Sequence, residues 1–224
     1  MNWMAIGVTC KLATLTSFAL LIIGLPIAYW LTYSKWRWKF LIESIVALPL
    51  VLPPTVLGFY ILIAIGPHSP IGRFYTDLVG HPLPFSFQGL LLASILYSLP
   101  FAVQPFATAF EQVDRKLIEA SWTLGLSKLK TFFRLILPLS TAGLITGVVL
   151  SFAHTLGEFG VVLMVGGNIE GITRTVSIEI YDEVQALNYA TAAKTSALLL
   201  LVSYAVLLLV YAMNRRVWSV WPRK

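Results

Sequence analysis

Residues 119–140 read EASWTLGLSKLKTFFRLILPLS, a polar, helix-forming stretch between long apolar runs. It carries Glu119, Lys128, Lys130 and Arg134 in the middle of a sequence that is 58% hydrophobic and only 12% charged. Soluble domains usually contain about 25% charged residues. A chain this apolar would expose too much hydrocarbon to water, so we expect lipid to be its solvent.

Long apolar runs on both sides of this stretch predict an all-α, polytopic membrane protein with five membrane-spanning segments. A helix needs about 20 mainly apolar residues to cross the hydrocarbon core. Prolines inside several of the runs predict breaks or kinks. The expected spans cover residues 8–32, 41–65, 88–110, 133–157 and 193–213 of a single domain, 1–224, with the polar loop 111–132 between the third and fourth.

The positions of the basic residues predict the orientation of these spans. Three Lys or Arg follow the first span, five lie in 111–134 and four in the C-terminal tail, which is twelve of the 16 in the chain. Because Lys and Arg concentrate in cytoplasmic loops, the N-terminus is expected outside and the C-terminus in the cytoplasm. This distribution, rather than the net charge of +6, is what matters in a membrane protein, and we expect no nucleic-acid partner.

Two longer segments lie on the expected outer side. Residues 66–87 contain four prolines with several glycines, which predicts a loop with little regular structure. Residues 166–192 begin with Gly-Gly-Asn and continue TVSIEIYDEVQ, which predicts a short amphipathic helix at the outer surface.

The polar loop itself is rich in helix-forming residues. A helix here places Leu117, Ala120, Leu124 and Ser127 on one face. Gly125 interrupts the pattern, and a glycine inside a helix costs roughly 1 kcal/mol relative to alanine and often marks a turn. We therefore predict two short helices hinged at Gly125.

This arrangement resembles the EAA loop of bacterial ABC importer permeases. The motif of that family is EAA, three residues, Gly, nine residues, Ile, one residue and Leu-Pro. Ser121 stands where the third motif residue is Ala, and Leu135 replaces the Ile. The residues that match are Glu119, Ala120, Gly125, Leu137 and Pro138. The alternative is an ordinary interfacial helix between two spans.

The resemblance implies a transport complex in the inner membrane of a bacterium or archaeon. The EAA loop of the family is a coupling helix that docks into a groove on a separate ATPase subunit. The implied assembly has two copies of this chain, two cytoplasmic ABC ATPases and one periplasmic or external binding protein, all held in membrane lipid. ATP and Mg would be bound by the ATPase, since this chain has no Gly-x-x-x-x-Gly-Lys-Ser/Thr phosphate loop. We expect no enzyme activity, cofactor or metal site in the chain itself.

A second resemblance concerns the cargo. Residues 157–181 read GEFGVVLMVGGNIEGITRTVSIEIY and residues 48–58 read LPLVLPPTVLG, and both are similar to permeases for molybdate and sulfate. The chain length and the LVLPP stretch favour molybdate within that group, and tungstate and sulfate stay open as alternatives.

The residues available to an anion inside the membrane are hydroxyls rather than cations. No Lys or Arg lies at the middle of an expected span, so we predict weak, transient passage, with specificity in the binding protein. The candidate hydroxyl donors are Thr14, Thr16, Ser17, Thr55, Ser94, Ser98, Thr141, Thr146 and Ser151.

Four further residues are candidates for a gate or for contact with the binding protein. His154 and Glu158 are four residues apart, so a continuous helix would place them on one face near the outer end of the fourth span. Asn168 and Tyr181 belong to the segment that resembles the oxyanion permeases. For His154 and Glu158 the alternative is an interfacial pair that only stabilises the helix end.

Two other classes of function compete with an ABC importer. An ATP-independent secondary transporter or channel would require ionisable residues buried within the spans, and the sequence shows none that is evident. An intramembrane enzyme would require a catalytic cluster at membrane depth, and the three histidines have no evident companions.

Overall fold

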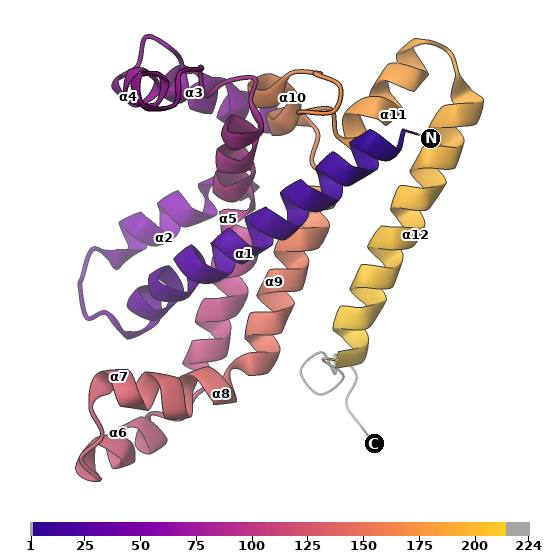
Figure 1. Ribbon diagram of the computed structural model, residues 1–224. Helices are drawn as coiled ribbons and strands as arrows, with labels where there is room; N and C mark the ends of the chain where they lie inside the picture. The colour runs from indigo at the N-terminus through magenta and orange to yellow at the C-terminus, as the bar shows by residue number, and fades with distance from the viewer. Residues whose placement is uncertain (1, 214–224) are drawn as a thin grey trace.

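The computed structural model describes residues 2–213, which form an all-helical molecule (Figure 1). Three helices are long and apolar enough to cross a membrane: α1 (Trp3–Tyr33), α5 (Phe87–Glu111) and α12 (Tyr189–Met213). Two bent helix pairs raise the number of candidate spans to five if each pair counts as one. The basic residues of the predicted cytoplasmic tail, from Arg215 onward, lie outside the described residues.

The first bent pair occupies the expected second span. Helix α2 (Lys39–Ala47) and the 3-10 turn η1 (Leu48–Leu50) are followed by α3 (Pro54–Ile65), and the two parts are bent by 113°. The break falls at the Pro53–Pro54 pair, where neither residue can donate a helical N–H. By contrast, α1 continues through Pro26, and α5 through Pro100 and Pro105.

The second bent pair occupies the expected fourth span. Helix α7 (Lys128–Thr131), the π-helical segment η2 (Phe132–Ile136) and α8 (Leu137–Leu139) precede a bend of 73°, after which α9 (Thr141–Leu156) begins. Residues 133–139, which the sequence placed in the span, therefore belong to a bent arm. The remaining helices are α6 (Arg115–Thr123), α10 (Gly160–Gly166) and α11 (Val176–Gln185).

The prediction of an irregular loop over 66–87 was wrong, because this segment contains α4 (Pro70–Val79). Ser69 caps the helix by accepting a hydrogen bond from the Gly72 N–H at 2.9 Å, and Pro70 occupies the first turn. Gly80 ends it with a left-handed φ of 84°. A Ser-Pro start and a glycine stop are recognisable helix signals that the proline count concealed. The short helix predicted within TVSIEIYDEVQ is present as α11.

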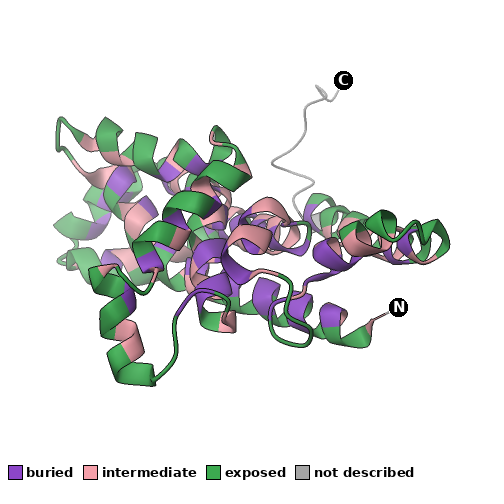
Figure 2. Cartoon of the chain, turned by 90° about the horizontal axis from the view of Figure 1, so that it is seen from above, coloured by how far each residue is buried: buried purple, intermediate pink, exposed green. Residues whose placement is uncertain are grey.

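The core of the molecule is the packing of α1, α5 and α9, which contact one another more extensively than any other set of helices (Figure 1). Viewed from above, buried residues gather where these helices meet and exposed residues cover the outer faces (Figure 2). The Phe106 ring of α5 is fully buried at this junction. A Cβ built on Gly147 of α9 would lie 2.5 Å from that ring, and one on Gly24 of α1 would lie 3.2 Å from it. Glycine at these positions lets the helices approach the ring closely.

Large apolar side chains cover the outer faces of the long helices. Of the most apolar 18-residue stretch of α12, only 11% is buried within the chain. Leu200, Leu201 and Tyr204 are each more than 60% exposed. Contiguous apolar surface on this scale indicates contact with lipid or with other subunits.

We predict that Gly147→Val destabilises the protein, because the added side chain would overlap the Phe106 ring that joins the three core helices. Overpacking of this kind costs about 1–3 kcal/mol, so the thermal unfolding midpoint of the protein in detergent should fall by several degrees. Gly7→Val is the matched control, since a Cβ at Gly7 meets nothing within 4 Å. Equal midpoints for the two variants would contradict this description of the core.

Candidate functional site

The polar segment between α5 and α9 forms an arm at the end of the molecule opposite the start of α1 (Figure 1). Its first helix, α6, begins at the cap Asp114, whose Oδ1 accepts a hydrogen bond from the Lys116 N–H at 2.9 Å. The α6 helix ends in a turn in which the Leu126 N–H donates to the Ser121 carbonyl and the Gly125 N–H to the Trp122 carbonyl. This hydrogen-bond pattern is a Schellman motif.

Gly125 occupies the left-handed position of that motif, with φ of 84°. A side chain is strained in this conformation, whereas glycine adopts it at little cost. The hinge predicted at Gly125 is therefore present in the structure, and its geometry explains why a glycine occupies this position.

Ser121 joins the two helices of the arm. Its Oγ donates to the Ile118 carbonyl at 2.6 Å and lies 2.8 Å from Thr131 Oγ1 of α7. Since the single Ser121 hydroxyl proton is engaged by the carbonyl, Thr131 must be the donor in the second bond. Both side chains are buried. The serine thus makes a contact that alanine could not, and no local sequence pattern indicates Thr131 as its partner.

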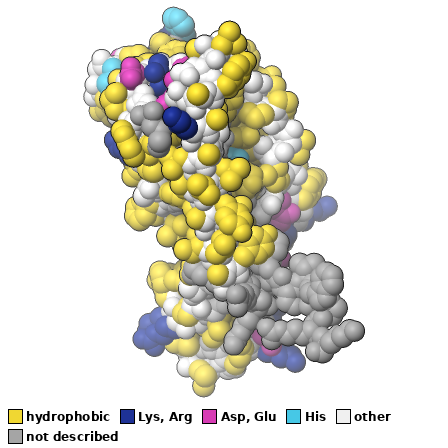
Figure 3. All heavy atoms as spheres, turned by 90° about the vertical axis from the view of Figure 1, so that its right-hand side faces the viewer, with side chains coloured by type: hydrophobic (Ala, Val, Ile, Leu, Met, Phe, Trp, Pro, Cys, Tyr) yellow, Lys and Arg dark blue, Asp and Glu magenta, His cyan; other side chains and the backbone are white. Residues whose placement is uncertain are grey.

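The surface of the arm is both apolar and basic. Glu119 and Ala120 are exposed, and the Glu119 carboxylate makes no hydrogen bond or ion pair with any described residue. The four residues predicted to share a face, Leu117, Ala120, Leu124 and Ser127, are all exposed. Basic and hydrophobic side chains lie side by side at this end of the molecule (Figure 3). The large apolar side chains exposed on the arm are Leu117, Trp122, Leu124, Leu129, Phe133 and Leu139.

The C-terminal part of the motif connects the arm to the core. Leu135 and Leu137 are half-buried and pack against the core cluster that contains Phe106 and Phe110, whereas Pro138 is exposed. Ser140, at the bend, donates its hydroxyl to the Ala109 carbonyl of α5 at 3.2 Å. The arm is therefore joined to both α5 and α9.

A second feature is a line of side chains along one face of α5, spaced by four, three, four and three residues. At 100° per residue this spacing keeps them on one narrow face of the helix. We call this line the α5 stripe, and its members are Tyr97, Phe101, Gln104, Thr108 and Glu111. The stripe was not predicted from the sequence, although its spacing is visible there.

The C-terminal part of the α5 stripe, from Gln104 to Glu111, borders a cavity of about 190 Å³. Gln104, Thr108 and Glu111 line one side, and Glu43 of α2 lies on the other. Glu43 also pairs with Lys39 at 3.5 Å. The cavity therefore offers polar groups beside the core, at the end of the molecule nearer the arm.

The N-terminal part of the α5 stripe, Tyr97 and Phe101, contacts His154 of α9. The imidazole stacks on the Phe101 ring with centroids 3.9 Å apart and lies 4.8 Å from the Tyr97 ring centroid. Its Nδ1 is 2.9 Å from Ser98 Oγ, which in turn is 3.1 Å from Thr155 Oγ1. Ser98 was among the predicted hydroxyl donors, whereas the roles of Tyr97, Phe101 and Thr155 were not foreseen.

Glu158 lies beyond the end of the helix that carries His154, contrary to the expectation that both share a helical face. Helix α9 ends at Leu156, and Gly157 and Glu158 form the break before α10. Glu158 is only 4% exposed, and neither carboxylate oxygen has a hydrogen-bond partner among the described residues. Its carboxyl lies beside Ser94 and Tyr97 of α5. The sequence predicts no ionisable residue buried within the spans, and Glu158 lies one residue beyond the expected span 133–157, where the structure buries it in the break between α9 and α10.

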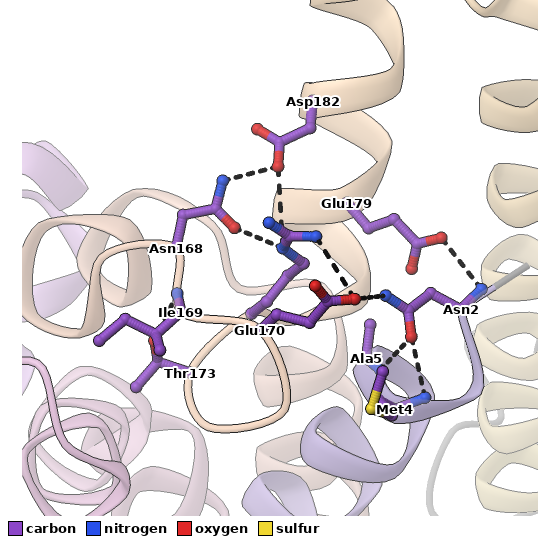
Figure 4. Close-up of polar contacts among 10 residues, drawn as sticks. Asn2, Met4, Ala5, Asn168, Ile169, Glu170, Thr173, Glu179 and Asp182 are labelled. Atoms are coloured by element: carbon purple, nitrogen blue, oxygen red, sulfur yellow. Dashed lines mark hydrogen bonds and ion pairs between the residues drawn. The ribbon is translucent and has the colours of Figure 1, made fainter.

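Asn168 and Tyr181 do not join this group. Asn168 donates to Asp182 at 2.6 Å and accepts from Arg174 at 2.6 Å, in a polar network that extends through Glu170 to Asn2 at the start of α1 (Figure 4). Tyr181 packs against the Phe159 ring, with centroids 5.1 Å apart. Within residues 2–213, no group of three or more His, Cys, Asp or Glu side chains could hold a metal ion.

The two segments that resemble oxyanion permeases meet in space. A Cβ built on Gly160 would lie 2.7 Å from Pro54 Cβ, and one on Gly58 would lie 2.8 Å from Met164 Cβ. Helices α3 and α10, each following a helix break, are therefore packed face to face with no room for larger residues at Gly58 and Gly160.

We predict that Thr131→Val loosens the arm, because it removes the donor to Ser121 while keeping the side-chain volume. A buried hydrogen bond contributes about 1 kcal/mol, which corresponds to about a fivefold change in a local opening equilibrium. Trypsin cleavage after Lys128 or Lys130 in the purified protein should accelerate by that factor. The control is Thr123→Val, since exposed Thr123 bonds only to carbonyls of its own helix; equal cleavage of both variants and wild type would refute the role of the Ser121–Thr131 contact.

The model of a family described as binding-protein-dependent transport system inner membrane component matches residues 21–219. A molybdenum transport system permease protein, ModB, of Azotobacter vinelandii is 50% identical over 211 residues, covering 94% of this chain and 93% of the relative. A probable sulfate transport system permease protein, cysT, of Prototheca wickerhamii is 32% identical, covering 92% of this chain and 80% of the relative.

Solved structures share the fold. The inward-facing MetNI methionine ABC transporter matches with a TM-score of 0.66 at 18% identity, covering 94% of this chain and 95% of that chain. A bacterial ABC transporter that imports the acidic polysaccharide alginate matches with a TM-score of 0.71 at 17% identity, covering 96% and 79%. The fold of this chain is thus the one found in ABC importer permeases.

Proposed function

Because this chain belongs to the family of binding-protein-dependent transport system inner membrane components, we propose that it is the membrane subunit of an ATP-driven molybdate importer. The 50% identity to a molybdenum permease over nearly the full length of both chains is the observation that supports this cargo. Sulfate permeases are less similar, at 32–34% identity. Tungstate is the alternative cargo.

Different parts of the chain suit different roles in such a complex, and the arm suits contact with the ATPase. The arm offers a carboxylate at Glu119 that is unpaired within residues 2–213, exposed apolar side chains and a left-handed turn at Gly125. Together these features suit docking of a helix into a groove of an ATPase. Of the other residues at motif positions, Ala120 allows close approach and Ser121 links α6 to α7. Leu135 and Leu137, followed by Pro138, join the arm to the core. ATP and Mg are bound by that ATPase subunit.

The pathway is proposed to follow the α5 stripe between two copies of this chain. A single chain leaves the stripe exposed along much of one face, and a two-fold axis would place two such faces opposite each other. Movement of the arms, which are joined to α5 and α9, would then open the route alternately to each side. A second copy, two ATPases and an external molybdate-binding protein complete the proposed complex.

The burial of Glu158 bears on the competing secondary transporter. A buried carboxyl is a feature that ion-coupled transporters use, so Glu158 removes one argument against that class. The arm, however, has no function in an ATP-independent transporter, and the family is defined by dependence on a binding protein. We therefore retain ATP-driven import as the proposal.

Reconstitution tests the function directly. The purified chain is combined with its genetically adjacent ATPase and binding protein in liposomes, and uptake of labelled molybdate, tungstate and sulfate is measured with and without internal ATP. Uptake of molybdate that requires ATP is expected. Uptake without ATP would refute the proposal, whereas a preference for sulfate would refute only the cargo.

We predict that Glu119→Arg and Gly125→Pro each separate ATP hydrolysis from transport. Proline cannot adopt the φ of 84° at residue 125, and arginine reverses the charge of a carboxylate that has no partner in the chain. Molybdate uptake per ATP hydrolysed should fall at least tenfold in each variant, while membrane insertion stays normal. Lys116→Ala serves as a control that changes an exposed charge outside the motif; wild-type uptake by both motif variants would exclude the coupling role.

We also predict that the arm faces the cytoplasm. In a Cys10→Ser background, an exposed cysteine at position 127 should react with a membrane-impermeant maleimide in inverted vesicles but not in intact cells. A cysteine introduced at exposed position 77 of α4 should show the opposite pattern. Labelling of position 127 from outside would reverse the proposed topology, in which the N-terminus is external and the C-terminus cytoplasmic.

A further inference from the structure

His154 is held in one orientation by its neighbours. The imidazole lies against Phe101 and Tyr97 of the α5 stripe, and its Nδ1 is hydrogen-bonded to Ser98. Three contacts from one helix therefore fix both the plane of the ring and the direction of its two nitrogens.

The hydrogen bonds around Ser98 determine which nitrogen carries a proton. The Thr155 hydroxyl donates to the Ser151 carbonyl at 2.9 Å, because a carbonyl can only accept. Thr155 Oγ1 then has no proton for Ser98, so Ser98 donates to Thr155. Ser98 has no second proton for His154, so the remaining bond requires His154 Nδ1–H to donate to Ser98 Oγ. The neutral ring therefore carries its proton on Nδ1.

The other nitrogen, Nε2, consequently carries a lone pair. His154 Nε2 has no hydrogen-bond partner among the described residues. The side-chain nitrogens and oxygens that are both buried and unpartnered do not include it, so Nε2 is exposed at the surface of the protomer. Beside the α5 stripe, the neutral histidine thus presents an acceptor. The oxygens of an oxyanion are also acceptors, and two acceptors cannot contact each other favourably without a proton between them.

We propose that His154 is an oxyanion contact in the membrane pathway, and that the anion engages Nε2 through one proton taken up from solution. This inference rests on the proposed function. The shared proton forms an N–H···O bond between Nε2 and one anion oxygen; it comes from water on entry and returns to water on exit, and no other bond changes. Whether it is assigned to the imidazole or to the anion, the proton count is the same.

The titratable groups near the ring agree with this arrangement. Tyr97 lies against the imidazole on α5, and Glu158, beyond the end of α9, lies beside Tyr97. Neither group supplies a positive charge, so the proton must compensate the anion. In a two-fold dimer the two His154 rings together accept two protons, which equals the charge of a molybdate dianion.

The test compares the pH dependence of uptake by wild type and His154→Gln in the complete reconstituted complex. Molybdate loaded on the binding protein is supplied below saturation between pH 6 and 9, with internal pH and ATP held constant. Above neutral pH, where an unpaired imidazole is uncharged, wild-type uptake relative to His154→Gln should fall by up to about tenfold per pH unit for each linked proton. Glutamine can donate a hydrogen bond without taking up a proton, and the ratio cancels pH effects on the ATPase and the binding protein.

Ser98→Ala gives an independent check of the proton assignment. Without the Ser98 acceptor, the neutral ring is free to carry its proton on Nε2 and to donate directly to the anion, so the pH dependence should flatten while uptake persists. Parallel pH profiles for wild type and His154→Gln would overturn the proposal, as would a Ser98→Ala profile as steep as that of wild type. Absence of ATP-dependent molybdate uptake by wild type at every pH would instead overturn the proposed function.

Discussion

The burial of one aromatic ring between two glycines governs how the molecule is built. Phe106 lies where α1, α5 and α9 converge, and Gly24 and Gly147 allow the neighbouring helices to reach it. In lipid there is little hydrophobic drive for helices to associate, so close contact through small residues has to supply the stability. With the core fixed on one side of α5, the opposite side of that helix is left for polar and aromatic side chains.

The two functional regions are linked through this core. The arm joins α5 at Glu111 and α9 at the Ser140 bend, and Ser140 is bonded to the Ala109 carbonyl. His154 lies further along the same two helices, against the α5 stripe. A force applied to the arm thus acts on the pair of helices that also carries the proposed anion contact, without any intervening flexible loop in the described chain.

The sequence predicted the regional organisation better than the local geometry. Apolar runs, basic loops and the EAA spacing were enough for the helical membrane fold and for the family, which the comparisons confirm. The turn at Gly125 also followed from its residue type, whereas its left-handed φ came from the structure. The break after α9 did not, because Gly157 interrupts a run whose hydropathy continues, and so the pairing of His154 with Glu158 was wrong. Ser121–Thr131 and Ser98–His154 are contacts of 10 and 56 residues' separation, and such contacts depend on tertiary packing that no local pattern records.

The contact between Gly160 and Pro54 has a consequence for how such permeases diverge and can be recombined. The residues that follow the two helix breaks are packed so closely that neither side can gain a methyl group without displacing the other. Gly160 and Pro54 are 106 positions apart in the sequence, yet their segments constrain each other as if they were one element. A chimera that takes 48–58 from one parent and 157–166 from another would combine surfaces that were never fitted together, so productive exchanges should transfer both as a unit.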